Sequence, residues 1–371
     1  MKRPLLTAAM IVRDEERHLP DCLASLQGVV DEIVVVDTGS VDDSVAIARA
    51  HGARVFRRQW DDDFSGPRNL GLSKARGRWI LYIDADERLR PIERSRVEAL
   101  LEDADEIGFR VHLHLYEHAT PSLEYRLWRN DRRVRFSGVV HNRVIDVLHA
   151  IAAAEGRPIG VCELTLDHLG LDGDQTRKHE RNLPLLQAQL AVYPTSSTNW
   201  LHLSRVLRGL ERLEEGERAL GRAIALAWDR DWDDGGVAWT DLVQLRRERG
   251  EDIALLLALG RAHWPENWML VWIEGQLQLE VGREGEAIAC FRRLLEVDPA
   301  RPQPVIYDER LFGSWALDAL ALALFRAGRY AEAADVYAAA ERLEPENAEY
   351  RVKRRLAESR AGQNCAAARI S

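Results

Sequence analysis

The chain contains 371 residues, enough for two or three domains of ordinary size. Hydrophobic residues make up 46% of it and charged residues 30%, a balance that excludes wholesale disorder. The net charge of −9 gives no electrostatic support to nucleic-acid binding, so we expect no nucleic-acid partner. Four scattered cysteines without CxxC spacing argue against a zinc site or a disulfide framework and favour a reducing, cytoplasmic location.

The amino terminus resembles a signal peptide only superficially. Its apolar run, residues 5–12, is short, leads directly into Arg13 and Asp14, and lacks a small-residue cleavage pattern. A buried first strand is the better interpretation. No apolar stretch approaches the roughly 20 residues that cross a bilayer, so we expect no transmembrane segment.

Strand and helix patterns alternate up to about residue 115. Continuous apolar strands separated by amphipathic helices predict an α/β domain whose Rossmann-like, mainly parallel sheet is covered on both faces. Ligands of such sheets bind beyond the carboxyl ends of the strands. The expected strands are 5–12, 32–37, 54–57 and 79–83, and the expected helices are 17–27, 41–51 and 66–75.

Acidic and polar residues follow these strands at the predicted ligand-binding edge. Asp84 and Asp86 come directly after the apolar run 79–83, and paired carboxylates suit a Mg²⁺ or Mn²⁺ ion that bridges a diphosphate. Asp37 ends the second strand, and Ser40 is a candidate N-cap for the next helix. Arg68 could neutralise a diphosphate with a bidentate contact, although a surface salt bridge is the alternative.

The carboxyl-terminal half carries a helical repeat. From about residue 183 only helical patterns appear, and Pro265 and Pro299 lie 34 residues apart, the period of the tetratricopeptide repeat (TPR). The next equivalent proline, Pro345, lies 46 residues further on, which predicts an insertion over 301–312. We therefore expect an all-α domain of stacked TPR-like hairpins, with a generic helical bundle as the alternative. The recurring landmarks are Gly250, Ile253, Leu257; Gly282, Ala287, Phe291; and Gly328, Ala333, Tyr337.

Residues 5–90 resemble the nucleotide-sugar-binding half of family 2 glycosyltransferases, which have the GT-A fold. The matching segments are 10–16, 34–42, 62–69, 74–79 and 83–87. The resemblance implies that Val12, Asp14 and Asp37 contact the nucleoside and that Arg68 contacts the diphosphate. It also implies that Asp84 touches ribose, or the metal through water, and that Asp86 is the direct metal ligand. Glu87 is expected to face the acceptor or solvent.

The middle segment resembles a branch of this family with an Arg-Leu-Phe-Arg-type stretch followed by Phe-x-Gly-x-x-His. By that resemblance His141 is a late metal ligand or a diphosphate contact, with a hydrogen-bonded strand histidine as the alternative. The family's late Glu-Asp pair is not recognisable here. Glu124 is therefore our first candidate for the catalytic base and Asp131 the second. Residues 167–170 are interpreted as a hinge to the repeats.

The expected domains are a catalytic GT-A domain over 1–175, TPR-like repeats over 176–361 and a flexible tail over 362–371. This combination resembles bacteriocin-peptide S-glycosyltransferases of the sublancin type. It implies an inverting, metal-dependent transfer from a nucleotide sugar, most simply a UDP-sugar, to a peptide or protein acceptor bound by the repeats. Transfer to a lipid-linked or lipopolysaccharide-type glycan, and a scaffold with an inactive transferase domain, are the alternatives. Assembly into a homo-oligomer stays open.

Overall fold

The computed structural model describes residues 3–138, 144–170, 175–228, 233–303 and 305–367. These fall into two compact units, Met1–Glu117 with Pro121–Leu226, and His118–Thr120 with Ala227–Ser371. The change from strands to helices occurs between His168 and Thr176, close to the expected domain boundary. The first unit nevertheless continues beyond that boundary and includes three of the helices that follow.

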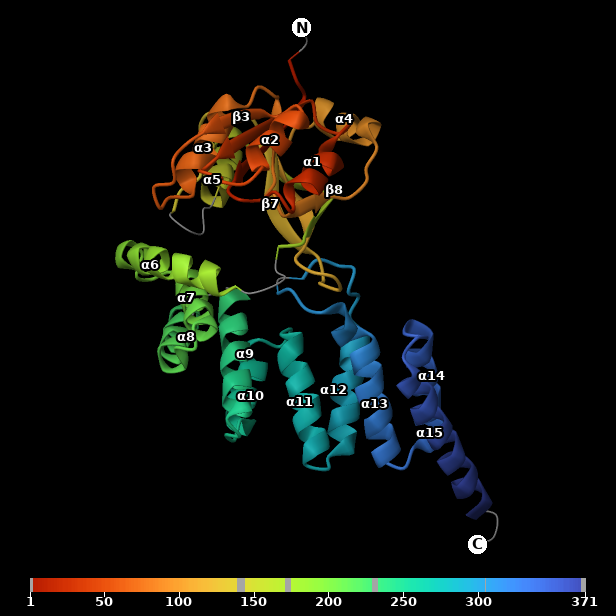
Figure 1. The fold of residues 1–371 in the computed structure, drawn as a ribbon. Coiled ribbons are helices and arrows are strands. Elements are labelled where there is room, and N and C mark those ends of the chain that lie inside the picture. The colour runs from red at the N-terminus through yellow and green to blue at the C-terminus, as the bar shows by residue number, and fades with distance from the viewer. Residues whose placement is uncertain (1–2, 139–143, 171–174, 229–232, 304, 368–371) are drawn as a thin grey trace. The chain divides into compact units, whose positions relative to one another are not determined.

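The first unit is built on an eight-stranded mixed sheet with the order β3-β2-β1-β4-β7-β6-β8-β5 (Figure 1). The four strands predicted from the apolar runs lie together and are parallel. β7 is antiparallel to both of its neighbours, and β5 is antiparallel to β8. The strands are β1 (Leu6–Val12), β2 (Glu32–Asp37), β3 (Arg54–Arg57), β4 (Trp79–Tyr82), β5 (Glu87–Leu89), β6 (Gly108–His114), β7 (Ser122–Arg129) and β8 (Ile159–His168).

Both faces of this sheet are covered, because alternate residues of each central strand enter different cores. In β4, Trp79 and Leu81 belong to one hydrophobic cluster, whereas Ile80 and Tyr82 belong to the other. This alternation explains why the strands read as continuous apolar runs. The helices of this part are α1 (Leu19–Leu26), α2 (Ser44–Ala50), α3 (Ser65–Lys74), α4 (Arg94–Glu102) and α5 (Ile145–Glu155).

Among the described residues after β8, the named elements are all helices, one of them a 3₁₀ helix. Gly250, Gly282 and Gly328 have φ values of 71°, 73° and 74° and connect successive helices in the left-handed conformation that glycine adopts most readily. The alanines and aromatic residues that follow the last two glycines are buried, so the repeat landmarks form hairpin core. The helices are α6 (Thr176–Val192), α7 (Ser197–Gly209), α8 (Leu213–Ala227), α9 (Asp233–Glu248), α10 (Ala254–His263), α11 (Trp268–Glu280), α12 (Glu284–Leu295), α13 (Ser314–Arg326), α14 (Tyr330–Leu343) and α15 (Ala348–Ala367).

The predicted insertion lies between α12 and α13 and contains the 3₁₀ helix η1 (Glu309–Phe312). Its backbone pairs with the segment His118–Thr120 of the same unit, where Thr120 N–H donates to Tyr307 O at 2.8 Å. α15 continues to Ala367, past the residue at which a tail was expected to begin, and 368–371 lie outside the described residues. No helix in the described ranges is both long and apolar enough to span a membrane.

Candidate active site

A cavity of about 780 Å³ opens at the carboxyl ends of β1, β2 and β4, the edge at which ligands of such sheets bind. Most of the polar residues predicted for the site line this cavity or are sequence neighbours of a residue that lines it. The lining comprises Ile11, Val12, Arg13, Asp14, Glu15, Thr38, Trp60, Phe64, Arg68, Asp84, Ala85, Asp86, His168, Gly170, Gln175, Arg177, Lys178, Arg181 and Asn182.

Asp84 is held by three neighbouring side chains. Its Oδ2 accepts a hydrogen bond from Arg126 Nη1 at 3.3 Å, and its Oδ1 lies 3.6 Å from Arg68 Nη2 and accepts from the Tyr82 hydroxyl. Both guanidinium carbons lie 4.8 Å from the centroid of the Tyr82 ring. Burial acts to raise the pKa of Asp84, but Arg126 and Arg68 outweigh it and lower that pKa below its ordinary value. Asp84 is therefore an ionised and fixed carboxylate.

Arg126 and Glu87 form a buried support beneath Asp84 that we did not identify from the sequence. Glu87 is fully buried and accepts hydrogen bonds from Arg126 Nη2 at 2.6 Å and from Asp84 N–H at 2.9 Å. The expectation that Glu87 faces the acceptor or solvent is wrong, because β5 turns back into the sheet directly after Asp86. Burial raises the pKa of Glu87, which shares one guanidinium with Asp84.

Asp86 has a different partner, His168. The pairing of Glu87 with His168 across β5 and β8 brings His168 Nε2 to 3.3 Å from Asp86 Oδ2. The other ring nitrogen, Nδ1, is buried and has no hydrogen-bond partner among the described residues. Gly170 packs against the Asp86 carboxylate, and a Cβ at this position would collide with it. The segment that we interpreted as a hinge thus contributes directly to the site.

The residues around Asp86 fit a divalent cation with an incomplete protein ligand set. Within the described residues, no three His, Cys, Asp or Glu side chains converge as a ready metal-binding group. A carboxylate beside an imidazole is nevertheless a donor set that accepts Mn²⁺ or Mg²⁺ when phosphate oxygens complete the coordination. Asp86 and His168 would hold such an ion. His141, the predicted late ligand, lies outside the described residues.

Glu15 is an acidic residue of the cavity that we did not predict as part of the site. Burial, together with the charges of Asp86 and Asp84, raises its pKa from 4.5 to about 7, although Lys178 acts in the opposite direction. Only the tertiary structure reveals this clustering, because Glu15 lies in a polar run after β1 that resembles an ordinary turn. The cavity therefore gathers more negative charge at the Asp86 side than the sequence motif alone provides.

The loops after β1 and β2 are joined by reciprocal hydrogen bonds. Asp14 has a φ of 55°; its N–H donates to Ser40 Oγ at 3.0 Å, and its Oδ1 accepts from Val41 N–H at 2.8 Å. The predicted N-cap role of Ser40 is wrong, since α2 begins at Ser44 and Ser40 bonds the opposite loop. Asp14 lines the cavity, but its carboxylate already supports the loop.

Val12 and Asp37 also have partners within the protein. The carbonyl oxygen of Val12 accepts from Thr38 N–H at 2.9 Å and from the Thr38 hydroxyl at 3.2 Å. Asp37 is buried, accepts from Ser40 N–H at 2.9 Å and lies 3.7 Å from Arg57 Nε. Thr38, not Asp37, is in the cavity lining. Nucleoside contacts by Val12 and Asp37 stay predictions.

The two candidates for the catalytic base lie at opposite edges of the sheet. Leu81 pairs with Leu127 in antiparallel β7, so the earlier residue Glu124 lies toward the carboxyl end of β4, beyond a register shift between β6 and β7. Asp131 follows the other end of β7 and is ion-paired with Arg133 at 2.5 Å. The second candidate for the base therefore does not belong to this site.

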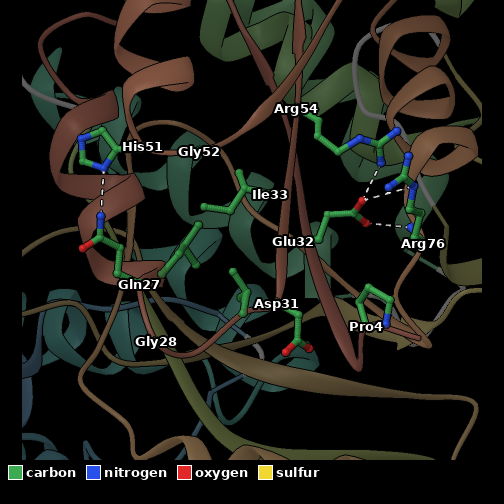
Figure 2. Close-up of a pocket in the computed structure, with 12 residues that line it drawn as sticks. Pro4, Gln27, Gly28, Asp31, Glu32, Ile33, His51, Gly52, Arg54 and Arg76 are labelled. Atoms are coloured by element: carbon green, nitrogen blue, oxygen red, sulfur yellow. Dashed lines mark hydrogen bonds and ion pairs between the residues drawn. The ribbon is translucent and has the colours of Figure 1, made fainter. Parts of the chain in front are cut away.

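A second cavity, of about 420 Å³, lies at the amino ends of β2 and β3 (Figure 2). Figure 2 shows Glu32 between Arg54 and Arg76. Glu32 accepts from Arg54 Nη1 at 2.5 Å, from the Thr7 hydroxyl at 2.7 Å and from Arg76 N–H at 2.7 Å. These partners leave the buried carboxylate satisfied, so this edge has a structural role.

Comparison with known families accords with the geometry of the carboxyl edge. Residues 7–141 match the model described as glycosyl transferase family 2. The N-terminal unit therefore contains a region similar to family 2 glycosyl transferases. Residues 272–301 of the same chain match the tetratricopeptide repeat model, which agrees with the predicted repeats. The predicted fold class and the combination of the two domains are thereby confirmed.

Two curated proteins are similar to more than half of this chain. A TPR repeat-containing protein of Synechococcus elongatus is 34% identical over 221 residues, which cover 57% of this chain and 53% of that protein. The SPbeta prophage-derived glycosyltransferase SunS of Bacillus subtilis is 26% identical over 231 residues, or 60% and 53% of the two chains. The chain thus spans about half the length of these curated relatives.

Solved structures overlap this chain only in part. Residues 1–349 of TarS from S. aureus superpose with a TM-score of 0.36 and 15% identity, covering 71% of this chain and 89% of that one. Glucosyl-3-phosphoglycerate synthase of Mycobacterium tuberculosis, solved with Mn²⁺, UDP and glucosyl-3-phosphoglycerate, gives a TM-score of 0.37 at 18% identity and covers 51% and 80%.

Proposed function

We propose that this chain is an inverting glycosyltransferase that uses a UDP-sugar and a divalent cation to modify a peptide or protein. The observation that carries the proposal is the division of roles between two carboxylates after β4. Asp84 is fixed by Arg68, Arg126 and Tyr82, whereas Asp86 faces the cavity beside His168. A carboxylate that holds two guanidinium groups, beside one that could ligate a cation, suits a site that stabilises an anionic leaving group.

In this proposal the donor's diphosphate lies between Arg68 and the Asp86–His168 pair. A bound Mg²⁺ or Mn²⁺ would supply positive charge to the departing diphosphate. Asp84 orients Arg68 and Arg126, so that the guanidinium of Arg68 is in place before the donor binds. Asp37 and the backbone at Val12 would contact the nucleoside, with Thr38 closest to the cavity.

Glu124 is the proposed base that orients or deprotonates the acceptor. The charge of Glu124 acts on Arg126, so Glu124 lies near the buried residues that hold Asp84. Direct displacement at the anomeric carbon needs one such base and no covalent intermediate. A Glu124→Gln variant should lower kcat and leave the affinity for UDP unchanged. A normal kcat would exclude Glu124 from this role.

A groove in the repeats supports a peptide acceptor over a glycan. A hollow of about 480 Å³ between α11 and α13 is lined by Trp272, Trp315 and Leu322, and the two indole rings lie 6.5 Å apart. Partly exposed aromatic residues of this kind anchor apolar peptide side chains. Leu322→Gln should raise the acceptor KM and leave donor hydrolysis unchanged, whereas Leu356→Gln, an exposed leucine on α15, serves as the control.

The activity can be tested directly. Purified chain, a panel of UDP- and GDP-sugars, Mn²⁺ and candidate peptides or glycans would be incubated and the products analysed by intact mass. Addition of a sugar mass to a peptide supports the proposal. Modification of a lipid-linked glycan alone would replace the peptide acceptor, and the absence of UDP binding by calorimetry would favour a scaffold.

A further inference from the structure

One wall of the cavity comes from the first turns of α6, and its side chains are basic. Arg177, Lys178 and Arg181 line the cavity together with Gln175 and Asn182. Lys178 and Arg181 are three residues apart and Arg177 and Arg181 four, so these cations share one helical face. α6 follows the last strand and lies beyond the region that matches the family model.

Lys178 and Arg181 lie near enough to Glu15 to interact with its charge, but no described carboxylate lies within ion-pair distance of the α6 cations. Arg181 Nε donates to Asn182 Oδ1 at 3.1 Å, and its guanidinium lies 5.4 Å from the centroid of the Phe64 ring. By contrast, Arg94 at the amino edge lies 3.0 Å from the Asp31 carboxylate.

The other arginine proposed to contact the diphosphate, Arg68, lies beside a carboxylate. Arg68 and Arg126 compensate Asp84, and a divalent cation would be held by Asp86. The cations of α6, which form no ion pair with a described residue, therefore leave room for an anion, and the positive end of the helix dipole acts in the same direction.

We propose that the basic face of α6, formed by Arg177, Lys178 and Arg181, binds the diphosphate of the nucleotide donor. This assignment rests on the proposed function and extends it, since a helix outside the sheet then completes the donor site. The cations would act mainly through charge, so their contribution should weaken with increasing salt.

The test measures the affinity of the full chain for UDP, UMP and uridine by calorimetry with saturating Mn²⁺. Lys178→Gln and Arg181→Gln should each weaken UDP binding by about tenfold and leave uridine binding unchanged. The double variant should lose about a hundredfold, and Lys178→Arg should restore most of the affinity. Arg222→Gln, an exposed arginine on α8 outside the cavity lining, is the matched control.

The outcomes separate this inference from the proposed function. Wild-type affinity for UDP in the double variant would overturn the α6 assignment alone, and so would an equal loss for UDP and uridine. Loss of acceptor affinity with unchanged UDP affinity would place an anionic acceptor group at this face and also overturn the assignment. Failure of the wild-type chain to bind UDP would overturn the proposed function together with this inference.

Discussion

The two edges of the sheet in the first unit carry similar residues and differ in how their charges are satisfied. At the amino edge, Glu32 is compensated by Arg54 and Arg76, and Asp31 by Arg94. At the carboxyl edge, Glu15 and Asp86 lie near Asp84, while basic residues of α6 line the same cavity and form no ion pair with any described carboxylate. Charge that the fold leaves uncompensated at a cavity therefore distinguishes the candidate site from a structural pocket.

The largest expected effect is on Asp86. Asp86→Asn should reduce metal-dependent transfer by about 10³-fold, because the diphosphate leaving group would lose the divalent cation that Asp86 is proposed to hold. Its Tm should stay close to that of the wild type, since the side chain faces the cavity. Asp131→Asn, at the opposite edge, is the control and should keep full activity; equal losses in both variants would contradict the assignment.

Next in size is a loss of stability at the amino edge. Glu32→Gln removes the charge that binds Arg54 and weakens the bonds to Thr7 and Arg76, which should cost about 2 kcal/mol in the free energy of unfolding. Urea denaturation measures this cost, and UDP affinity should not change. A drop in UDP affinity without a loss of stability would show that the amino-edge cavity is itself a ligand site.

A smaller effect is expected for Tyr82, which positions Asp84. Tyr82→Phe keeps the ring against Arg68 and Arg126 but removes the hydrogen bond to Asp84, so kcat should fall by about fivefold to tenfold. Tyr125→Phe is a matched control, because its hydroxyl bonds His149 at 2.8 Å. The assignment would fail if the two variants had equal kcat values.

The smallest effect is a difference in pH dependence. Burial acts to raise the pKa of Glu32, but its hydrogen bonds lower it below 4.5, so its stabilisation is present above that pH and is lost as the pH falls through the folded-state pKa. Ionisation of Glu15 has the opposite effect on stability. Its pKa is raised to about 7, so stability declines as the pH rises from 4.5 to 7. Glu15→Gln should therefore gain stability relative to the wild type between pH 5 and 7.5 in urea denaturation, whereas Glu32→Gln should show no such gain.

The parallel strands and the carboxylates after β4 were predictable because both depend on local sequence. A strand buried on both faces must be apolar throughout, and polar residues directly after it must lie at its carboxyl end. The residues that we missed lie far along the chain from their partners. Arg126 is 42 positions from Asp84, and the contact of His168 with Asp86 depends on the pairing of β8 with β5.

The sequence by itself thus determined the first four strands with the helices between them, the repeat period and the motif Asp84–Ala85–Asp86, because hydrophobic periodicity and turn residues act over short distances. Only the tertiary structure decided that Asp84 is fixed by two arginines, that Asp86 faces a histidine, and that Asp131 lies at the wrong edge. Register between distant strands sets these contacts, and a side chain's charge partner depends on that register rather than on its neighbours in the chain.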